Sequence, residues 1–485
     1  MKTIKKNVQE FKLIKKITII TFVCYFLLAG LFYYLAGEEL HLRQSKGNIH
    51  LLTATSGAVE LIKDNSVEQE FVSKIQILQG VSVQMGTYMR KNTGTVNFEL
   101  VDAETGAILL DKSIDVGNIS EGEIIDLPIG TDIEGTYGHK LKLSIYSKDC
   151  VNGNAVSPLI NSVEKKSDSQ LYFNKQPVNG TLCFTSYGKD HVWTGMYYKQ
   201  IVMSGACVLA CIILIITMKI KTNRRSYILN LFDAMNKYKF LIQQLVSRDF
   251  KTKYKRSILG IFWSFLNPLF MLAVQYFVFS TIFKSDIPYY HIYLLIGIVM
   301  FNYFSEACGI SLASIISNTG LITKVYIPKY IYPLSKILSS TVNLVISLLP
   351  LIGAMVISGV PFSKSFFLVP FALMCLVIFC FGLGMLLSAS MVYFRDTQFL
   401  WGIASMLWMY ATPIFYPESI LPNQFKFVLD YNPIYYLIKF VRTCILEGIS
   451  PEPFLYIQCF LFSFGMLIVG AVIFKRSQDK FVLNL

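Results

Sequence analysis

The sequence predicts a membrane-spanning all-α helical bundle of about eight helices, six of them in the C-terminal half, joined to an antiparallel β-sandwich outside the membrane. The first observation is composition: of 485 residues, 53% are hydrophobic, 14% aromatic and only 15% charged, which is too apolar for an ordinary soluble protein. The second is a set of apolar runs about as long as a spanning helix. The third is a polar stretch with alternating, strand-like segments between the first two runs.

The net charge of +13 reports membrane topology rather than binding to nucleic acid. Lys and Arg cluster beside the ends of apolar runs, at Lys2–Lys16, Lys219–Arg225 and Lys475–Lys480. Clusters of this kind mark the cytoplasmic ends of membrane helices. We therefore expect no nucleic-acid partner.

Residues 1–36 are expected to form a basic cytoplasmic segment and the first membrane helix. The apolar run Ile17–Leu35 has about the 20 residues that a spanning helix needs. A signal peptide begins similarly, but its apolar core is usually shorter and ends at small residues, whereas Ala29-Gly30 lies inside this run. The run predicts an uncleaved anchor with Met1 in the cytoplasm.

Residues 37–198 are expected to form the β-sandwich. Segments such as Val96–Val101 and Lys140–Tyr146 alternate with period two, and turn formers such as Asn152-Gly-Asn154 separate them. The helices on both sides carry positive charge on their far ends, which places this domain outside the cytoplasm. There, Cys150 and Cys183 could form a disulfide, while two free thiols are expected if the cell lacks an oxidising pathway.

The remaining chain divides into a second membrane helix at 199–222, a cytoplasmic linker with an amphipathic interface helix at 223–260, and a six-helix domain at 261–485. The six apolar runs of that domain are Ile261–Phe283, Tyr289–Ile316, Ile337–Val360, Phe366–Val392, Phe399–Phe415 and Phe454–Phe474. Six crossings return the C-terminus to the cytoplasm, which agrees with the basic residues after the last run.

Four local patterns in the second half go beyond hydropathy. They are Arg248-Asp249-Phe-Lys251 with Leu259-Gly260 and Trp263; the cytoplasmic loop Asn318–Pro328; Tyr393-Phe-Arg395-Asp396; and Thr412-Pro413-Ile-Phe-Tyr416-Pro417 with Asn432-Pro433 and Arg442. In this order and spacing they resemble the permease subunit of ABC exporters for polysaccharides, the family that exports O-antigen and teichoic-acid chains. The resemblance covers residues 240–485. Two departures are the helices and sandwich that precede it and a loosely matching tail at Phe474–Phe481.

The resemblance implies a type-2 ABC exporter fold with two permeases, two ATPase subunits and a channel between the permeases. Expected partners are therefore a second copy of the chain, an ABC ATPase subunit, a polyprenyl-linked glycan cargo and membrane lipids. The chain contains no Gly-x-x-x-x-Gly-Lys-Ser/Thr. We expect it to be a transporter rather than an enzyme and to bind no cofactor, with ATP and Mg²⁺ in the partner. The expected location is the bacterial cytoplasmic membrane, with both termini inside and residues 37–198 outside.

The resemblance also implies residues that couple the chain to the ATPase. They are Ile322, Thr323, Lys324, Val325, Tyr326 and Pro328 in the cytoplasmic loop, with Arg248, Asp249, Arg395 and Asp396. The alternatives are an ordinary surface loop, a basic face that only orients the chain, and, for Arg395, a stop signal.

Three further sets are candidates for the cargo. Aromatic residues of the substrate path are Trp263, Phe270, Tyr276, Trp401, Trp408 and Tyr410, for which lipid contact or helix packing is the alternative. Cations for a lipid diphosphate are Lys251, Lys253, Lys255 and Arg256. Outer-gate residues are Pro413, Tyr416, Pro417, Asn432 and Pro433, where prolines interrupt any continuous helix and an external loop is the alternative. Glu306, alone within its span, is expected to face the bundle interior or a water path.

The outer domain offers a weaker signal. Its run Val83–Asp102 is similar to jelly-roll domains of the galactose-binding type. The similarity implies Tyr88, Arg90 and Asn92 as glycan contacts, and a spacer or docking platform is the alternative.

Two other function classes remain open at this stage. A membrane glycosyltransferase or polymerase would need outer carboxylates such as Glu418, Asp430 and Glu447 for bond formation. An ATP-independent glycan receptor would use the sandwich as its binding part. Within the exporter fold, another lipid or a drug is an alternative cargo.

Overall fold

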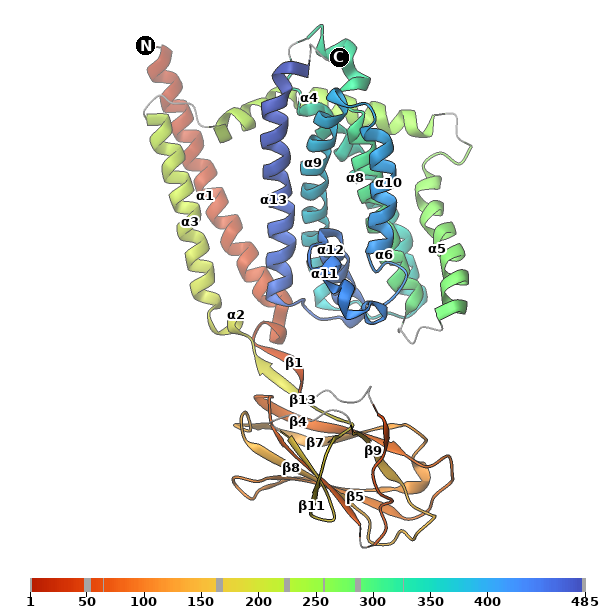
Figure 1. Ribbon diagram of the computed structural model, residues 1–485. Helices are drawn as coiled ribbons and strands as arrows, with labels where there is room; N and C mark the ends of the chain where they lie inside the picture. Colours follow the sequence, from red (N-terminus) through yellow and green to blue (C-terminus); the bar gives the residue numbers. More distant parts are fainter. Residues whose placement is uncertain are drawn as a thin grey trace. The chain divides into compact units, whose positions relative to one another are not determined.

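The computed structural model describes residues 2–47, 54–63, 65–162, 169–221, 227–255, 258–283, 289–325 and 327–481. The chain folds into two compact units (Figure 1). One is Glu38–Lys199; the other combines Met1–Gly37 with Gln200–Leu485. The boundary lies beside the one expected from composition, and each unit has its own hydrophobic core.

The first unit is an antiparallel β-sandwich, which confirms the predicted class. One sheet has the order β1 (Leu42–Gly47), β13 (Phe184–His191), β4 (Ile77–Gly86), β9 (Ser157–Asn161), β12 (Thr181–Leu182), with β2 (Ser56–Gly57) on β9 and β7 (Ile124–Glu134) on β4. The other has the order β11 (Gln176–Val178), β10 (Ser169–Phe173), β3 (Ser66–Val72), β8 (Lys140–Tyr146), β5 (Thr95–Asp102), β6 (Ile108–Asp115). All the described pairings are antiparallel.

Alternation along the strands builds the sandwich core. In β8, Leu141, Leu143 and Ile145 are fully buried, because successive side chains point to opposite faces. On the other face Lys142 pairs with Glu68 of β3 at 2.7 Å. Burial of the apolar face holds the two sheets together, and the ion pairs cover the face that remains in water.

The two cysteines of the sandwich are not bonded to each other. Cys150 and Cys183 are both buried thiols. Cys150 follows β8 of the six-stranded sheet, where its Sγ lies 3.7 Å from the carbonyl oxygen of Thr93. Cys183 lies between β12 and β13 of the other sheet. Of the two expected possibilities, the structure therefore has the free thiols, and the Sγ of Cys150 contacts the carbonyl oxygens of Thr93 and Thr95 instead of a second sulfur.

The second unit is a helical bundle (Figure 1). Its main helices are α1 (Lys2–Ala36), α3 (Tyr198–Lys221), α4 (Tyr227–Tyr254), α5 (Phe262–Phe283), α6 (Tyr290–Leu312), α8 (Ile331–Ile357), α9 (Val369–Tyr393), α10 (Thr397–Ala411), α12 (Pro433–Arg442) and α13 (Pro453–Ser477). Seven helices within the described residues are long and apolar enough to span a membrane. The one expected span that is not among these seven, Phe399–Phe415, corresponds to α10, whose 15 residues are about 22 Å long and fall short of a full crossing.

Helix α4 runs across one end of the bundle rather than along it (Figure 1). It ends in the basic turn that contains Lys251 and Lys253. The chain then bends through Gly260, which has a φ of +50° that favours glycine, and enters α5. This arrangement is the surface helix feeding a membrane helix that the sequence predicts.

Helix α6 lies at the centre of the bundle, with most of its residues buried against α8, α9 and α12. Helices α9 and α13 touch backbone to backbone. A Cβ atom on Gly470 would overlap the carbonyl group of Gly382, so both positions need glycine for the close approach.

Candidate functional site

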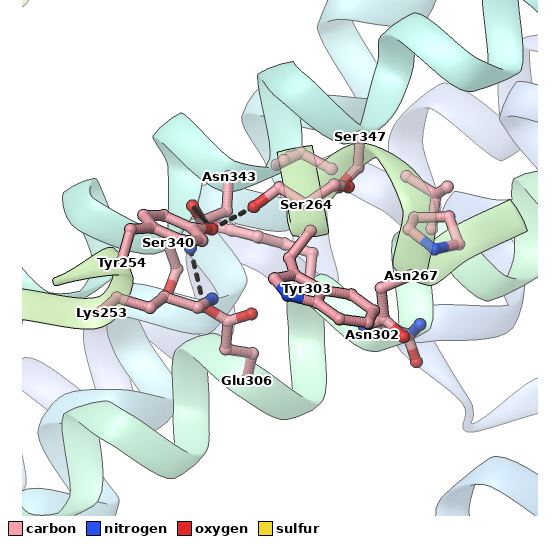
Figure 2. A pocket seen from close by; sticks show the side chains of 14 residues that line it. Lys253, Tyr254, Ser264, Asn267, Asn302, Tyr303, Glu306, Ser340, Asn343 and Ser347 are labelled. Carbon is pink, nitrogen blue, oxygen red and sulfur yellow. Dashed lines mark hydrogen bonds and ion pairs between the residues drawn. The ribbon is translucent and has the colours of Figure 1, made fainter. Parts of the chain in front are cut away.

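A polar cavity of about 170 Å³ lies between α4, α5, α6 and α8 (Figure 2). Ten of its lining side chains are polar: Lys253, Tyr254, Ser264, Asn267, Asn302, Tyr303, Glu306, Ser340, Asn343 and Ser347. The sequence places them on common helix faces, because Asn302 and Glu306 are four residues apart in α6 and Ser340 and Asn343 are three apart in α8.

Glu306 is the hydrogen-bonding centre of one side of this cavity. Its Oε1 accepts from Nζ of Lys253 at 2.7 Å, Nδ2 of Asn343 at 3.0 Å and Oγ of Ser340 at 3.4 Å. The hydroxyl of Tyr254 donates to Oδ1 of Asn343 at 2.9 Å. The carboxylate therefore faces a polar cavity, as its position within an apolar run predicts.

The Arg-Asp pattern ties three elements together near the other face of α4. Oδ2 of Asp249 lies 2.9 Å from Nζ of Lys336 in α8, and its Oδ1 accepts from Nη2 of Arg248 at 3.1 Å. Nη2 of Arg248 also donates to Oδ1 of Asn318, at the end of the segment after α6, at 3.4 Å. Asp249 is thus engaged within the chain, where it links α4 to α8, rather than presented to an outside partner.

The expected coupling loop presents an exposed turn. After α7 (Thr319–Ile322), Thr323, Lys324 and Val325 are exposed, whereas Ile322 packs against the core cluster formed with α4 and α8. Pro328 is half-buried. Tyr326 lies outside the described residues.

The remaining coupling residues and most of the cations predicted for the lipid diphosphate are also exposed. Arg395 and Asp396 at the start of α10 are exposed, and within the described parts of the chain neither forms an ion pair. Lys251 and Lys255 are exposed at the end of α4, whereas Lys253 is held by Glu306. Arg256 lies outside the described residues.

The segment after α10 is not helical, and side chains satisfy its carbonyl groups. Arg442 of α12 donates from Nη1 to Pro413 O at 2.7 Å and from Nη2 to Ile414 O at 3.0 Å and Tyr293 O at 3.1 Å. Its guanidinium lies 3.3 Å from the centre of the Tyr293 ring. The hydroxyl of Tyr290 donates to Phe415 O at 2.6 Å. These donors explain how irregular backbone is tolerated at membrane depth.

Asn432 joins this segment to α12. Its Oδ1 accepts from the backbone N–H of Ile434 at 3.1 Å and from Nε1 of Trp408 at 2.8 Å. Its Nδ2 donates to Oγ1 of Thr412 at 2.8 Å. Asn432 is buried, as are Pro413 and Pro433, while Tyr416 and Pro417 are half-buried. The predicted gate residues therefore meet at one place, and the prolines interrupt helix as expected.

The predicted path aromatics separate into two groups. Trp401 and Trp408 pack against Phe304, with ring centres 5.7 and 5.1 Å away, which is helix packing rather than exposure to a path. Trp263, Phe270, Tyr276 and Tyr410 are exposed on this chain. Among the outer carboxylates, Glu418 is paired with Lys439 at 3.1 Å.

The loop after β4 carries the predicted glycan contacts of the outer domain. Tyr88 and Met89 have positive φ values of 56°, and the carboxylate of Glu121 holds this conformation by accepting the backbone N–H groups of Thr87 and Met89 at 2.7 and 3.0 Å. These bonds lower the pKa of Glu121. Tyr88 is exposed and Arg90 lies over its ring.

Asn92 differs from the other two glycan candidates. It is buried, and its Nδ2 donates to the carbonyl of Thr87 at 3.0 Å. As a glycan contact this prediction is wrong, because the side chain supports the loop from inside.

Sequence reasoning missed several residues of the polar cavity, of the Asp249 ion pair and of the segment after α10. Tyr290, Tyr293 and Lys336 look like ordinary interface residues of apolar runs. The amides Asn267, Asn302 and Asn343 carry a usable signal, because amides at helical spacing inside apolar runs indicate a shared polar face.

Comparisons with known proteins agree with the motif-based resemblance. Residues 240–446 match the ABC-2 type transporter family. The chain is 28% identical over 242 residues to the O-antigen export system permease protein RfbA of Klebsiella pneumoniae, covering 50% of this chain and 93% of the relative. It is 27% identical over 259 residues to RfbA of Myxococcus xanthus, covering 52% and 98%. The polysialic acid transport protein KpsM of Escherichia coli is 21% identical over 249 residues, covering 51% and 96%. The resemblance stated from the four patterns is thereby confirmed.

Proposed function

We propose, from the match of residues 240–446 to the ABC-2 type transporter family, that the chain is the permease subunit of an ATP-driven exporter that moves a polysaccharide across the bacterial cytoplasmic membrane. The observation that carries this proposal is that relatives named as export permeases for O-antigen and polysialic acid are matched over nearly their whole length. The chain itself is a multi-pass membrane protein and a transporter rather than an enzyme. ATP and Mg²⁺ belong to a separate ATPase subunit.

The exposed turn Thr323–Val325 is the part of the chain that contacts the ATPase. Its neighbours pass a displacement inward, because Asn318 bonds to Arg248 and Asp249 is paired with Lys336. A movement of the turn therefore reaches α4 and α8, which line the polar cavity. Arg395 and Asp396, exposed just before α10, are further contacts with the ATPase in this proposal.

A second copy of the chain completes the exporter. Helix α5 supports this assembly, because it is exposed along most of its length and also lines the polar cavity. Trp263 lines that cavity, while Phe270 and Tyr276 are exposed on α5 and available to a second copy. The cargo, a lipid-linked polysaccharide or a teichoic-acid-like polymer, passes between the two copies.

The lipid end of the cargo meets the cations at the end of α4. Lys251 and Lys255 are exposed there, and Arg256 follows directly in the sequence. Positive residues beside a membrane surface attract phosphate groups. With these cations in the cytoplasm, both termini are cytoplasmic and residues 37–198 are outside.

Deletion of the gene with complementation tests the proposal. Surface polysaccharide should disappear on deletion and return with the unchanged chain, but not with Lys324→Glu, which should also lose an ATPase that copurifies with the unchanged chain. Lys237→Glu, a change of an exposed lysine on α4, is the matched control and should complement. Unchanged surface polysaccharide in the deletion strain, or no ATPase after crosslinking and gentle extraction, would refute the export function.

A further inference from the structure

Two amides in the polar cavity have no partner within the described parts of the chain. Asn267 of α5 and Asn302 of α6 line the cavity, and neither side chain hydrogen-bonds to another described residue. Both belong to helices of spanning length. Asn267 is exposed and Asn302 is half-buried on this chain, so both amides are available to water or to a polar ligand in the cavity.

The rest of the lining has the chemistry that recognises a sugar. Amide and hydroxyl groups both donate and accept hydrogen bonds, as the hydroxyl groups of a sugar do. The cavity offers these groups from Asn343, Ser340 and Ser347 in addition to the two free amides. Trp263, one turn before Asn267 on α5, also lines the cavity, and the C–H face of a sugar ring can pack on its aromatic ring. In Figure 2, Lys253 and Tyr254 lie at one side of this space and Asn267 and Asn302 at the other.

The charges of the cavity favour a neutral ligand over an anion. Lys253 and Glu306 are paired at 2.7 Å and cancel each other. A phosphate that took Lys253 would leave the Glu306 carboxylate beside it, where two like charges repel. A neutral ring with hydroxyl groups avoids this conflict and leaves the ion pair in place.

The size of the cavity limits the ligand to one ring. Its volume of about 170 Å³ is smaller than the ~300–1,000 Å³ typical of pockets that enclose drug-sized ligands. The side chains of Lys253 and Glu306 are 42% and 36% exposed, so the cavity can be reached from outside the chain.

From these observations we infer that the cavity binds a single neutral sugar ring of the cargo, with Asn267 and Asn302 as the direct hydrogen-bonding contacts and Trp263 as the packing surface. The inference rests on the proposed export function for the source of the sugar. It adds a discrete sugar-binding position to a path that otherwise only conducts the polymer.

Photocrosslinking in cells tests binding directly. Trp263 is replaced by p-benzoyl-phenylalanine, which has a similar size and reacts with nearby C–H bonds. Leu461, which is 63% exposed on α13 and does not line the cavity, gives the control position. The expected result is a glycan-positive adduct at 263, none at 461, and none at 263 when synthesis of the polymer is blocked.

Export by amide variants tests the two contacts. Asn302→Leu and Asn267→Leu should each lower the rate of polysaccharide export at least tenfold, and Asn302→Gln should retain part of it. Membrane level and ATPase copurification should not change, because replacing an unpaired amide by an apolar group removes a polar group that lacks a partner in the empty chain. Ile468→Leu, on an exposed part of α13 that does not line the cavity, should export normally.

The outcomes separate this inference from the export function. An adduct at 263 that contains phospholipid but no sugar would overturn the sugar site, as would normal export by both Leu variants without any adduct. In either case surface polysaccharide would still depend on the chain, and the export function would stand. Surface polysaccharide that does not depend on the chain would refute the export function, while a sugar adduct at 263 would still support the site.

Discussion

Replacing Arg442 by Met should loosen the irregular segment that follows α10. The guanidinium donates three hydrogen bonds, to the carbonyl groups of Pro413, Ile414 and Tyr293. Hydrogen bonds inside membrane proteins average about 0.6 kcal/mol, and those in soluble proteins about 1 kcal/mol. The loss of three bonds should therefore cost about 2 to 3 kcal/mol of local stability.

Hydrogen exchange measures this loss at the segment itself. Since each 1.4 kcal/mol corresponds to about a tenfold change in an equilibrium constant, exchange of the hydrogen-bonded amides of Thr412 and Ile414 should rise roughly 30- to 140-fold. The peptide that covers these residues can be followed by mass spectrometry in the purified chain. The exchange rate of Arg442→Lys should lie between those of the unchanged chain and Arg442→Met, because one ammonium group cannot reach all three carbonyl groups.

Lys439 gives the matched control, one turn earlier on α12. Its ion pair with Glu418 is 42% exposed on both sides, and exposed pairs contribute about 0.2 to 1 kcal/mol. Lys439→Met should therefore raise exchange at 412–416 by less than about fivefold. If Arg442→Met has no larger effect than this control, the guanidinium does not hold the segment and the reasoning fails.

Three further predictions concern other parts of the chain. Lys336→Met should lower export while ATPase copurification persists, because Asp249 loses its link to α8. Gly470→Leu should reduce the amount of folded chain in the membrane, because a side chain there overlaps α9, whereas Gly465→Leu meets open space and should be tolerated. The outer domain should lose stability as pH falls from about 3.8 to about 2, because burial, which opposes ionisation, is outweighed by hydrogen bonds from His139 and the backbone N–H groups of Glu104 and Thr105 that lower the pKa of Asp102 to about 2.

The stability of the outer domain should also fall as pH rises, which we call the alkaline limb of its pH dependence. The hydrogen bond to Asp102 raises the pKa of His139 above 6.5, so its contribution is present below that pH and is lost as pH rises through the raised value. Thermal unfolding of residues 38–199, which have their own core, measures both limbs. His139→Asn should remove the alkaline limb; its persistence would show that another group titrates there. Normal export by Lys336→Met would contradict the proposed link between α4 and α8. Equal membrane levels of Gly470→Leu and Gly465→Leu would contradict the proposed contact between α9 and α13.

Local patterns in the sequence were sufficient to predict which segments form strands or helices. They were not sufficient to predict which of these elements pack together. The alternation in β8 predicts a strand because only every second residue is apolar, but the order of strands depends on pairings between distant segments such as β3 and β8. The apolar run at 399–415 predicts a span, yet Pro413 and Pro417 end the helix early and shift the remaining length into irregular backbone.

In the polar cavity, too, one residue could be predicted from the sequence and its neighbours could not. Glu306 stands out in the sequence because a carboxylate within an apolar run needs a polar neighbour. Its neighbours Lys253 and Asn343 come from other helices, and no local pattern connects them. Asn92 was misassigned because a polar residue in a turn looks exposed, whereas here it is buried under the loop that it supports.

The contact between Gly382 and Gly470 has a mechanical consequence. At this point the two helices, of 25 residues each and about 37 Å long, meet through their backbones, and no side chain lies between them that could repack. We therefore expect α9 and α13 to move together. At one end of the two helices, Lys329 donates to the carbonyl of Gln478 and Tyr393 donates to that of Ser477. A displacement of the segment around Lys329 should therefore move both helices, and bending should occur where side chains separate this pair from its neighbours.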